Sequence, residues 1–222
     1  MNTALADRRL DARSQAGGVY VKICGLDTAD NARVAVEAGA DAIGVVMSAS
    51  SSRGLDAARA RRIVDAVGDA ADTVLVTNDL GAREAAEVAS RLGVTVLQLH
   101  GPAYSEASYR EALHVMPRVW RATSLADAPS LQVGAHGEEA LLLDAATPGS
   151  GETWDVAALD GSAIDGPWLL AGGLTPANVA AAIEVANPWG VDVSSGVESS
   201  RAVKDPGLIR EFIGAAKHLQ LR

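Results

Sequence analysis

One pattern recurs along this chain and limits the folds that it can adopt: a short apolar run, a loop, and an alanine-rich amphipathic stretch that often ends in glycine. The apolar runs lie at 19–24, 42–47, 73–78, 95–100, 118–123, 140–145, 168–173 and 190–195. They are too apolar to leave one face in water, as is typical of parallel strands that helices cover. Between the runs, apolar residues recur at helical spacing, as at Ala60, Ile63, Val64 and Val67. This alternation predicts a parallel α/β architecture.

Eight strand–helix units in 222 residues fit a (β/α)₈ TIM barrel, which we expect to form a single domain over residues 19–222. The alternative is an open doubly wound sheet, a fold that usually carries a glycine-rich phosphate loop after its first strand. Here the first apolar run leads into CGLDTAD, which contains one glycine, so the barrel is favoured. We expect residues 1–18 to be a flexible N-terminal extension.

Short polar residues predict where several helices begin. Asp27 is expected to cap the first helix, with Asp30 following at capping-box spacing. Thr175 is expected to cap the helix after the seventh strand, with Pro176 in its first turn. Asp205–Pro206 is expected to open the last helix. With these helix boundaries, short loops would connect the helices to the neighbouring strands.

Composition and charge limit the class of protein. Hydrophobic residues make up 48% of the chain and aromatic residues only 4%, so Ala, Val, Leu and Ile must fill the core. The net charge is −9 and no basic run occurs, which argues against a nucleic-acid partner. A single cysteine, Cys24, excludes an internal disulfide. No stretch approaches the roughly 20 apolar residues of a membrane span, and the start lacks a signal-peptide core, so we expect a cytoplasmic protein without a membrane partner.

Polar side chains stand at or just after the ends of several predicted strands, where the active site of a TIM barrel lies. They are Cys24, Arg53, Gln98, His100, Asp144 and Asp192. A thiol that faces a carboxyl group suits proton transfer in an isomerisation, because one group removes a proton while the other supplies one. No Cys/His cluster has metal-ligand spacing and no Walker loop is present, so we expect neither a metal nor a cofactor.

Glycines and small residues follow the seventh and eighth strands, where TIM barrels commonly bind phosphate. Gly172 and Gly173 end the seventh run, and Ser194, Ser195 and Gly196 follow the eighth. Backbone N–H groups in such loops, together with the start of a short helix, can hold an anion. The expected partner is therefore a small phosphorylated molecule.

Six stretches share their residues and their order with one known family. They are VKICGL (21–26), AGADAIGVV (38–46), LQLHG (97–101), LLLDAATPGSGETWDV (141–156), LLAGGLTPANV (169–179) and VDVSSGVESS…KD (191–205). Together they cover nearly the whole chain after residue 18, and KICG and DVSSGVE are the most specific. On these residues the chain resembles the phosphoribosylanthranilate isomerase family of tryptophan biosynthesis.

The resemblance implies an Amadori rearrangement of N-(5′-phosphoribosyl)anthranilate to 1-(2-carboxyphenylamino)-1-deoxyribulose 5-phosphate. It implies Cys24 as general base, Asp144 as general acid and Arg53 as the group that binds the anthranilate carboxylate. The backbone around Gly173 and Ser195–Gly196 would hold the phosphate. Gln98, His100 and Asp192 would contact the rest of the substrate, and the enzyme would be a monomer or a homodimer.

The chain departs from the family pattern in two loops. The family often has Ser-Pro-Arg around its substrate arginine, whereas this chain has SSSRG at 50–54. After Asp144 the family commonly shows a Gly-Gly-Thr-Gly-Lys loop, whereas this chain has PGSGETWD, which is shorter and lacks the lysine. These departures bear on the role of Arg53 and on the loop beside the predicted acid.

Other interpretations of the same residues stay open at this point. The barrel could be a different sugar-phosphate isomerase or lyase, with Lys22 as a catalytic lysine because it shares a strand face with Cys24. It could also be a non-catalytic sugar-phosphate-binding barrel. Cys24 could be an inert core thiol, Arg53 a solvated loop arginine, and Asp192 a residue that only orients backbone amides.

Overall fold

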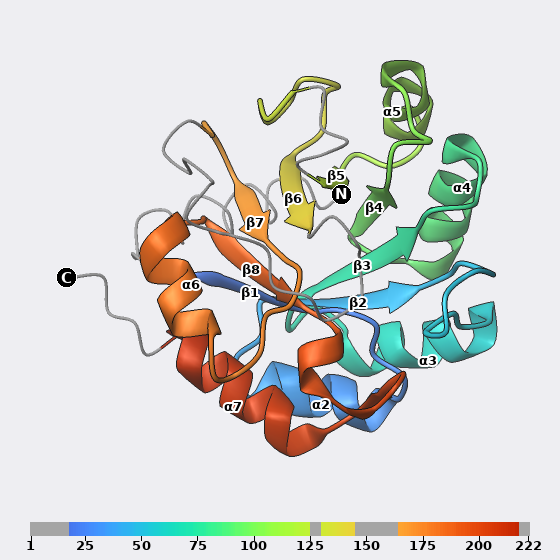
Figure 1. Ribbon diagram of the computed structural model, residues 1–222. Helices are drawn as coiled ribbons and strands as arrows, with labels where there is room; N and C mark the ends of the chain where they lie inside the picture. The colour runs from blue at the N-terminus through green and yellow to red at the C-terminus, as the bar shows by residue number, and fades with distance from the viewer. Residues whose placement is uncertain (1–17, 125–129, 145–163, 218–222) are drawn as a thin grey trace.

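The computed structural model describes residues 18–124, 130–144 and 164–217, so the expected extension at 1–18 falls almost entirely outside the described residues. Eight strands, each parallel to its neighbours, form a closed barrel in sequence order (Figure 1). The strands are β1 (Tyr20–Ile23), β2 (Ala42–Val46), β3 (Asp72–Thr77), β4 (Val96–His100), β5 (Val119–Ser124), β6 (Ala140–Asp144), β7 (Trp168–Leu170) and β8 (Gly190–Val193). Pairing of β1 with β8 closes the barrel. The predicted TIM barrel is confirmed, and the open doubly wound sheet is wrong.

Helices in the described residues surround the barrel (Figure 1). They are α2 (Ala29–Glu37), α3 (Ala57–Val67), α4 (Ala82–Leu92), α5 (Glu106–Leu113), α6 (Val179–Ala186) and α7 (Pro206–Lys217). The apolar stripe predicted for α3 is fully buried. Apolar residues at helical spacing in α4 and α6 face the core too, and of these Val88 and Ala182 are only partly buried. The last helix, α7, packs beside α2, so the outer layer brings the first and last helices of the described residues together.

Two predicted helix starts are wrong by a few residues. Thr28, not Asp27, caps α2, because its side chain accepts a hydrogen bond from the backbone N of Asn31. Asp27 instead accepts a bond from the Asn31 side chain at 2.9 Å. The helix α6 begins after Asn178 rather than after Thr175, because residues 176–178 form a turn. The Asn178 side chain accepts a bond from the backbone N of Thr175 at 2.7 Å. The start of α7 agrees with the sequence, since Asp205 accepts bonds from the first backbone N–H groups of that helix.

The lower half of the barrel interior is filled and closed. The side chain of Trp120 is fully buried inside the barrel and meets Tyr20 edge to face. At the N-terminal ends of the strands, Arg118 forms ion pairs with Asp72 and Glu139 at 2.8 and 2.9 Å. This network occupies the base of the barrel, so the open end is the C-terminal mouth, where TIM barrels place their chemistry. No helix of the described residues is long and apolar enough to cross a membrane.

Candidate active site

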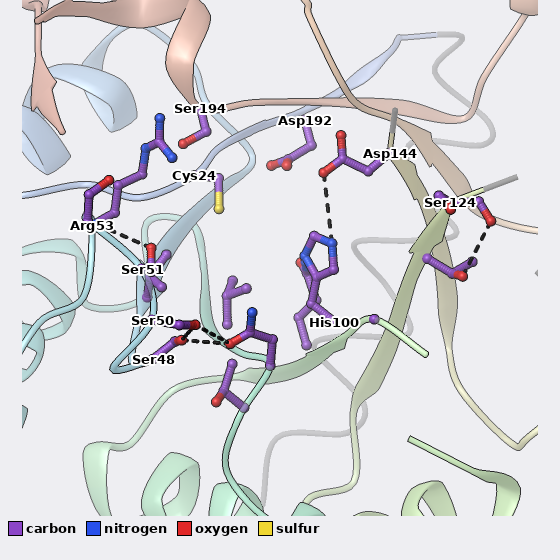
Figure 2. A pocket seen from close by; sticks show the side chains of 18 of the residues that line it. Cys24, Ser48, Ser50, Ser51, Arg53, His100, Ser124, Asp144, Asp192 and Ser194 are labelled. Atoms are coloured by element: carbon purple, nitrogen blue, oxygen red, sulfur yellow. Dashed lines mark hydrogen bonds and ion pairs between the residues drawn. The ribbon is translucent and has the colours of Figure 1, made fainter. Parts of the chain in front are cut away.

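A pocket of about 530 Å³ opens at the C-terminal mouth, which is a volume typical of small-molecule sites (Figure 2). Seven of the residues predicted from sequence line it: Cys24, Arg53, Gln98, His100, Asp144, Asp192 and Ser194. Figure 2 shows Cys24 and Asp144 on different sides of this pocket, with His100 facing Asp144. The structure therefore brings the predicted thiol and carboxyl group together, one from the end of β1 and the other from the end of β6.

Cys24 directly follows β1, and its backbone N–H donates to the carbonyl of Val193 at 2.8 Å, which fixes it against the end of β8. The residue is 7% exposed. A Cβ added at Gly44 on β2 would lie 3.0 Å from the sulfur and 3.2 Å from the Cα of Cys24. Glycine at this position therefore makes room for the thiol. Burial raises the pKa of Cys24, and the nearby ammonium of Lys22 opposes that rise.

Lys22 lies under the pocket rather than in it. Its side chain is fully buried, and its Nζ donates to Asp192 Oδ1 at 2.8 Å. The two residues are paired in the β1–β8 register, so both side chains point into the barrel. Burial lowers the pKa of Lys22, but the interactions with Asp192 and Cys24 together outweigh burial and leave this pKa raised. Asp192 therefore lines the pocket as predicted and also anchors the ammonium group.

Asp144 and His100 lie across the pocket from the arginine side. Asp144 is the last residue of β6, and its Oδ2 lies 3.9 Å from Nε2 of His100. Burial lowers the pKa of His100, which favours a neutral ring near neutral pH. Beside them, the Oε1 atom of Gln98 is buried and has no hydrogen-bond partner within the described structure. A buried acceptor of this kind is suited to a hydroxyl group of a ligand.

Arg53 is held in place by a carboxylate that the sequence interpretation did not assign. Its Nε and Nη2 donate to the two oxygens of Glu198 at 2.6 and 3.0 Å. Lys204 donates to the same carboxylate at 2.8 Å and to the carbonyl of Ser194 at 2.7 Å. The Arg53 side chain is 15% exposed, so the alternative of a solvated loop arginine is wrong. Among the described contacts of the guanidinium group, Nη1 remains available for a ligand.

Comparisons with known proteins agree with this geometry. Residues 21–215 match the model of the N-(5′-phosphoribosyl)anthranilate isomerase family. The chain belongs to this family. An N-(5′-phosphoribosyl)anthranilate isomerase from Rhodopseudomonas palustris (strain HaA2) is 40% identical over 210 residues, covering 90% of this chain and 96% of that protein.

Solved structures of isomerases from the family share the fold. TrpF from Jonesia denitrificans is 50% identical, with a TM-score of 0.83 over 90% of this chain and 97% of that chain. A phosphoribosylanthranilate isomerase in complex with reduced 1-(o-carboxyphenylamino)-1-deoxyribulose 5-phosphate is 32% identical, with a TM-score of 0.78 over 89% and 98% of the two chains. A member of the family has thus been seen with a phosphorylated product analogue.

The loops predicted to bind phosphate lie at one side of the barrel mouth, but only Ser194 of their residues lines the pocket. Gly172 and Gly173 adopt φ values of 87° and 65°, a region that favours glycine. Ser195–Val197 forms a short 3₁₀ helix. A Cβ at Gly196 would come within 1.8 Å of the carbonyl oxygen of Leu174, so this glycine is required for the two loops to pack. The phosphate role of these residues stays a prediction.

Some residues at or beside the isomerase pocket were not singled out from the sequence. Asp79, after β3, accepts hydrogen bonds from the Ser48 side chain and the Ala49 backbone at 2.9 and 2.7 Å, which ties down the serine-rich loop that leads to Arg53. Arg201 lines the pocket and donates to Ser52 at 3.2 Å. The run SASSSRG was the one signal that a polar loop would border the site. The altered loop after Asp144 lies outside the described residues.

Proposed function

We propose that this chain catalyses the Amadori rearrangement of N-(5′-phosphoribosyl)anthranilate to 1-(2-carboxyphenylamino)-1-deoxyribulose 5-phosphate, a step of tryptophan biosynthesis. Membership of the isomerase family supports this assignment. The single observation that carries it is the meeting of Cys24 and Asp144 in one pocket, because a base and an acid on different sides of a sugar can move protons at two of its atoms.

Two proton transfers by the enzyme and a final tautomerisation make up the reaction. Asp144 donates a proton to the furanose ring oxygen, the C1′–O bond breaks, and the anthranilate nitrogen forms a Schiff base with C1′. The thiolate of Cys24 then removes the proton from C2′, and the electron pair of that C–H bond gives an enolamine. Proton transfer from the C2′ hydroxyl to C1′ completes the ketone product, and proton exchange with solvent returns Cys24 to the thiolate and Asp144 to the acid. No step requires an oxidant, since the substrate and product are isomers.

The pocket offers a binding group for each part of the substrate. Arg53 would receive the anthranilate carboxylate through Nη1, while Glu198 holds its other nitrogens. Gln98 would accept a hydrogen bond from a ribose hydroxyl, and Asp192 and His100 would border the sugar. The backbone of Gly172, Gly173, Ser195 and Gly196, with Ser194, would hold the phosphate. A monomer or homodimer without cofactor stays our prediction for the active enzyme.

A lysine-based mechanism on the same barrel is disfavoured by the placement of Lys22. Attack on a carbonyl requires a neutral amine with access to the substrate. Lys22 is fully buried, and its ion pair with Asp192 favours the charged ammonium. A non-catalytic barrel would need neither a thiol nor a carboxyl group in the pocket, and it is separated from the isomerase by a direct assay.

The assay follows the loss of substrate fluorescence with freshly prepared phosphoribosylanthranilate. Cys24→Ala and Asp144→Asn should each lower kcat by at least about 10²-fold, the usual effect of removing a positioned base or acid. Affinity for a reduced product analogue should change far less, because the carboxylate and phosphate contacts remain. Asp65→Asn, which alters an exposed ion pair on α3, serves as the control. Near wild-type kcat in Cys24→Ala would exclude its role as base.

A further inference from the structure

A buried ion pair lies next to the thiol that the proposed reaction uses as its base. Lys22 is 0% exposed and its Nζ is 2.8 Å from Asp192 Oδ1. Lys22 lies in β1 and Cys24 directly follows it, two residues further on, so their side chains share the interior face of the barrel. An ion pair so deeply buried is costly to desolvate, and it is not required to fill space, because apolar side chains fill the adjoining interior.

The position of Gly44 shows how closely the two groups are packed. The Cβ that any other residue would carry at this point of β2 would lie 3.0 Å from the sulfur of Cys24 and 3.3 Å from Nζ of Lys22. Both atoms therefore occupy the same small space above the backbone of Gly44. A thiolate formed at Cys24 would have the ammonium of Lys22 beside it, in a site from which water is largely excluded.

We propose that Lys22, held in place by Asp192, is a positioning residue that supplies the counter-charge for the thiolate of Cys24. This inference rests on the proposed function, in which the thiolate is the base. Lys22 does not touch the substrate and acts through the sulfur. Because the interior is poorly solvated, a fixed positive charge there stabilises an anion more strongly than it would in water.

Other charged groups also face Cys24 and must be weighed against Lys22. Asp192, on β8, opposes formation of the thiolate, whereas Lys204, on β10 (Val203–Lys204), and Arg53, in the loop after β2, favour it. Both of these cations bind Glu198, which offsets part of their charge. His100 and Asp144 stand across the pocket. Lys22 contributes the largest opposing influence to the rise in the pKa of Cys24 that burial causes.

The test uses the fact that the chain contains one cysteine, so alkylation by iodoacetamide, followed by intact mass, reports Cys24 alone. The rate of alkylation against pH gives the midpoint for thiolate formation without any reference to catalysis. Lys22→Met should raise this midpoint by about one pH unit or more, which is the usual effect of losing an adjacent opposite charge. Lys217→Met, which breaks a different Lys–Asp pair at the base of the barrel, should leave the midpoint unchanged.

A second variant should shift the alkylation midpoint in the opposite direction. Asp192→Asn removes the carboxylate that competes for Lys22, so the thiolate becomes the remaining counter-ion of the ammonium and the midpoint should fall. The double variant Lys22→Met/Asp192→Asn should still lie above the wild type, because the cation is gone. An unchanged midpoint in both single variants, or a double variant that returns to the wild-type value, would overturn the proposal. Circular dichroism establishes that each variant is folded before its midpoint is used.

These outcomes stay distinguishable from failure of the proposed function. If Cys24→Ala retains kcat, the base assignment fails even though the alkylation midpoints can still shift. If Cys24→Ala is inactive and Lys22→Met leaves the midpoint in place, the base assignment stands and the counter-charge role is wrong. With both ideas correct, the limb of the kcat profile that Cys24 sets should move in Lys22→Met in the same direction as the alkylation midpoint.

Discussion

Glu198 accepts hydrogen bonds from Nε and Nη2 of Arg53 at 2.6 and 3.0 Å, although the two residues are 145 positions apart in the sequence. This pairing joins the loop after β2 to β9 (Glu198–Ser200), which follows β8 along the chain. A bidentate carboxylate fixes both the position and the plane of a guanidinium group. The direction in which Arg53 offers its remaining nitrogen to the pocket is therefore set by Glu198.

We expect Glu198→Gln to raise KM by roughly tenfold or more, because an amide can match only one of the two guanidinium contacts and a hydrogen bond to a charged group contributes about 1.5–3 kcal/mol. The value of kcat should change much less, since the acid and the base are untouched. Steady-state kinetics over a wide range of substrate concentration give both constants. Glu106→Gln, which alters an exposed ion pair on α5, is the matched control. Equal KM values for the two variants would contradict the positioning role.

Acid stability should depend on the same carboxylate. Burial raises the pKa of Glu198, but hydrogen bonds from Arg53 and Lys204 outweigh burial and lower it from 4.5 to about 2. A folded-state pKa below the unfolded value contributes stability that is present above about pH 4.5 and is lost as the pH falls towards 2. Urea unfolding at pH 7 and at pH 3 should therefore show the advantage of the wild type over Glu198→Gln shrinking on acidification. A difference that stays constant with pH would count against this pKa.

Gly25→Ala should disturb Arg53 as well as the backbone. Gly25 has a φ of 69°, and an added Cβ would lie 2.8 Å from Cδ of Arg53. We expect a loss of about 1–2 kcal/mol in stability from the left-handed backbone together with a raised KM. Gly93→Ala provides a control, because Gly93 has a φ of 71° and open space around its Cβ position. That variant should lose stability with no change in KM, whereas similar KM values in both would show that Gly25 does not support the arginine.

The pH dependence of kcat should report the thiol. Burial raises the pKa of Cys24, so the thiolate fraction should still be increasing with pH above neutrality. The value of kcat depends on the fraction of molecules that carry the Cys24 thiolate and the Asp144 proton together, so its pH profile should be bell-shaped, and a thiol pKa above that of the acid makes this fraction small. Cys24→Ser should be nearly as inactive as Cys24→Ala, because a hydroxyl group forms almost no anion in this range. Rates measured from pH 5 to pH 10 test this profile, and full activity in the serine variant would exclude thiolate catalysis.

The strands and the helix faces could be predicted because burial imposes a period on the sequence, and the stripe of Ile63 and Val64 on α3 is an example. Helix starts were harder, since the choice between Asp27 and Thr28 depends on which side chain reaches a free backbone N–H. The meeting of Cys24 with Asp144 followed from the rule that strand ends converge at the barrel mouth. The ion pair between Glu198 and Arg53 could not be predicted, because contacts between distant loops leave no local pattern in the sequence.

The closed base of the barrel affects how substrate enters and product leaves the enzyme. With Arg118, Asp72 and Glu139 sealing one end and Trp120 filling the space above them, substrate and product use the same entrance. A released product molecule therefore competes with incoming substrate for the single opening at the C-terminal mouth. Any enzyme that takes the product directly must dock against the rim of the mouth. The rate of product release through this opening is an upper limit on kcat.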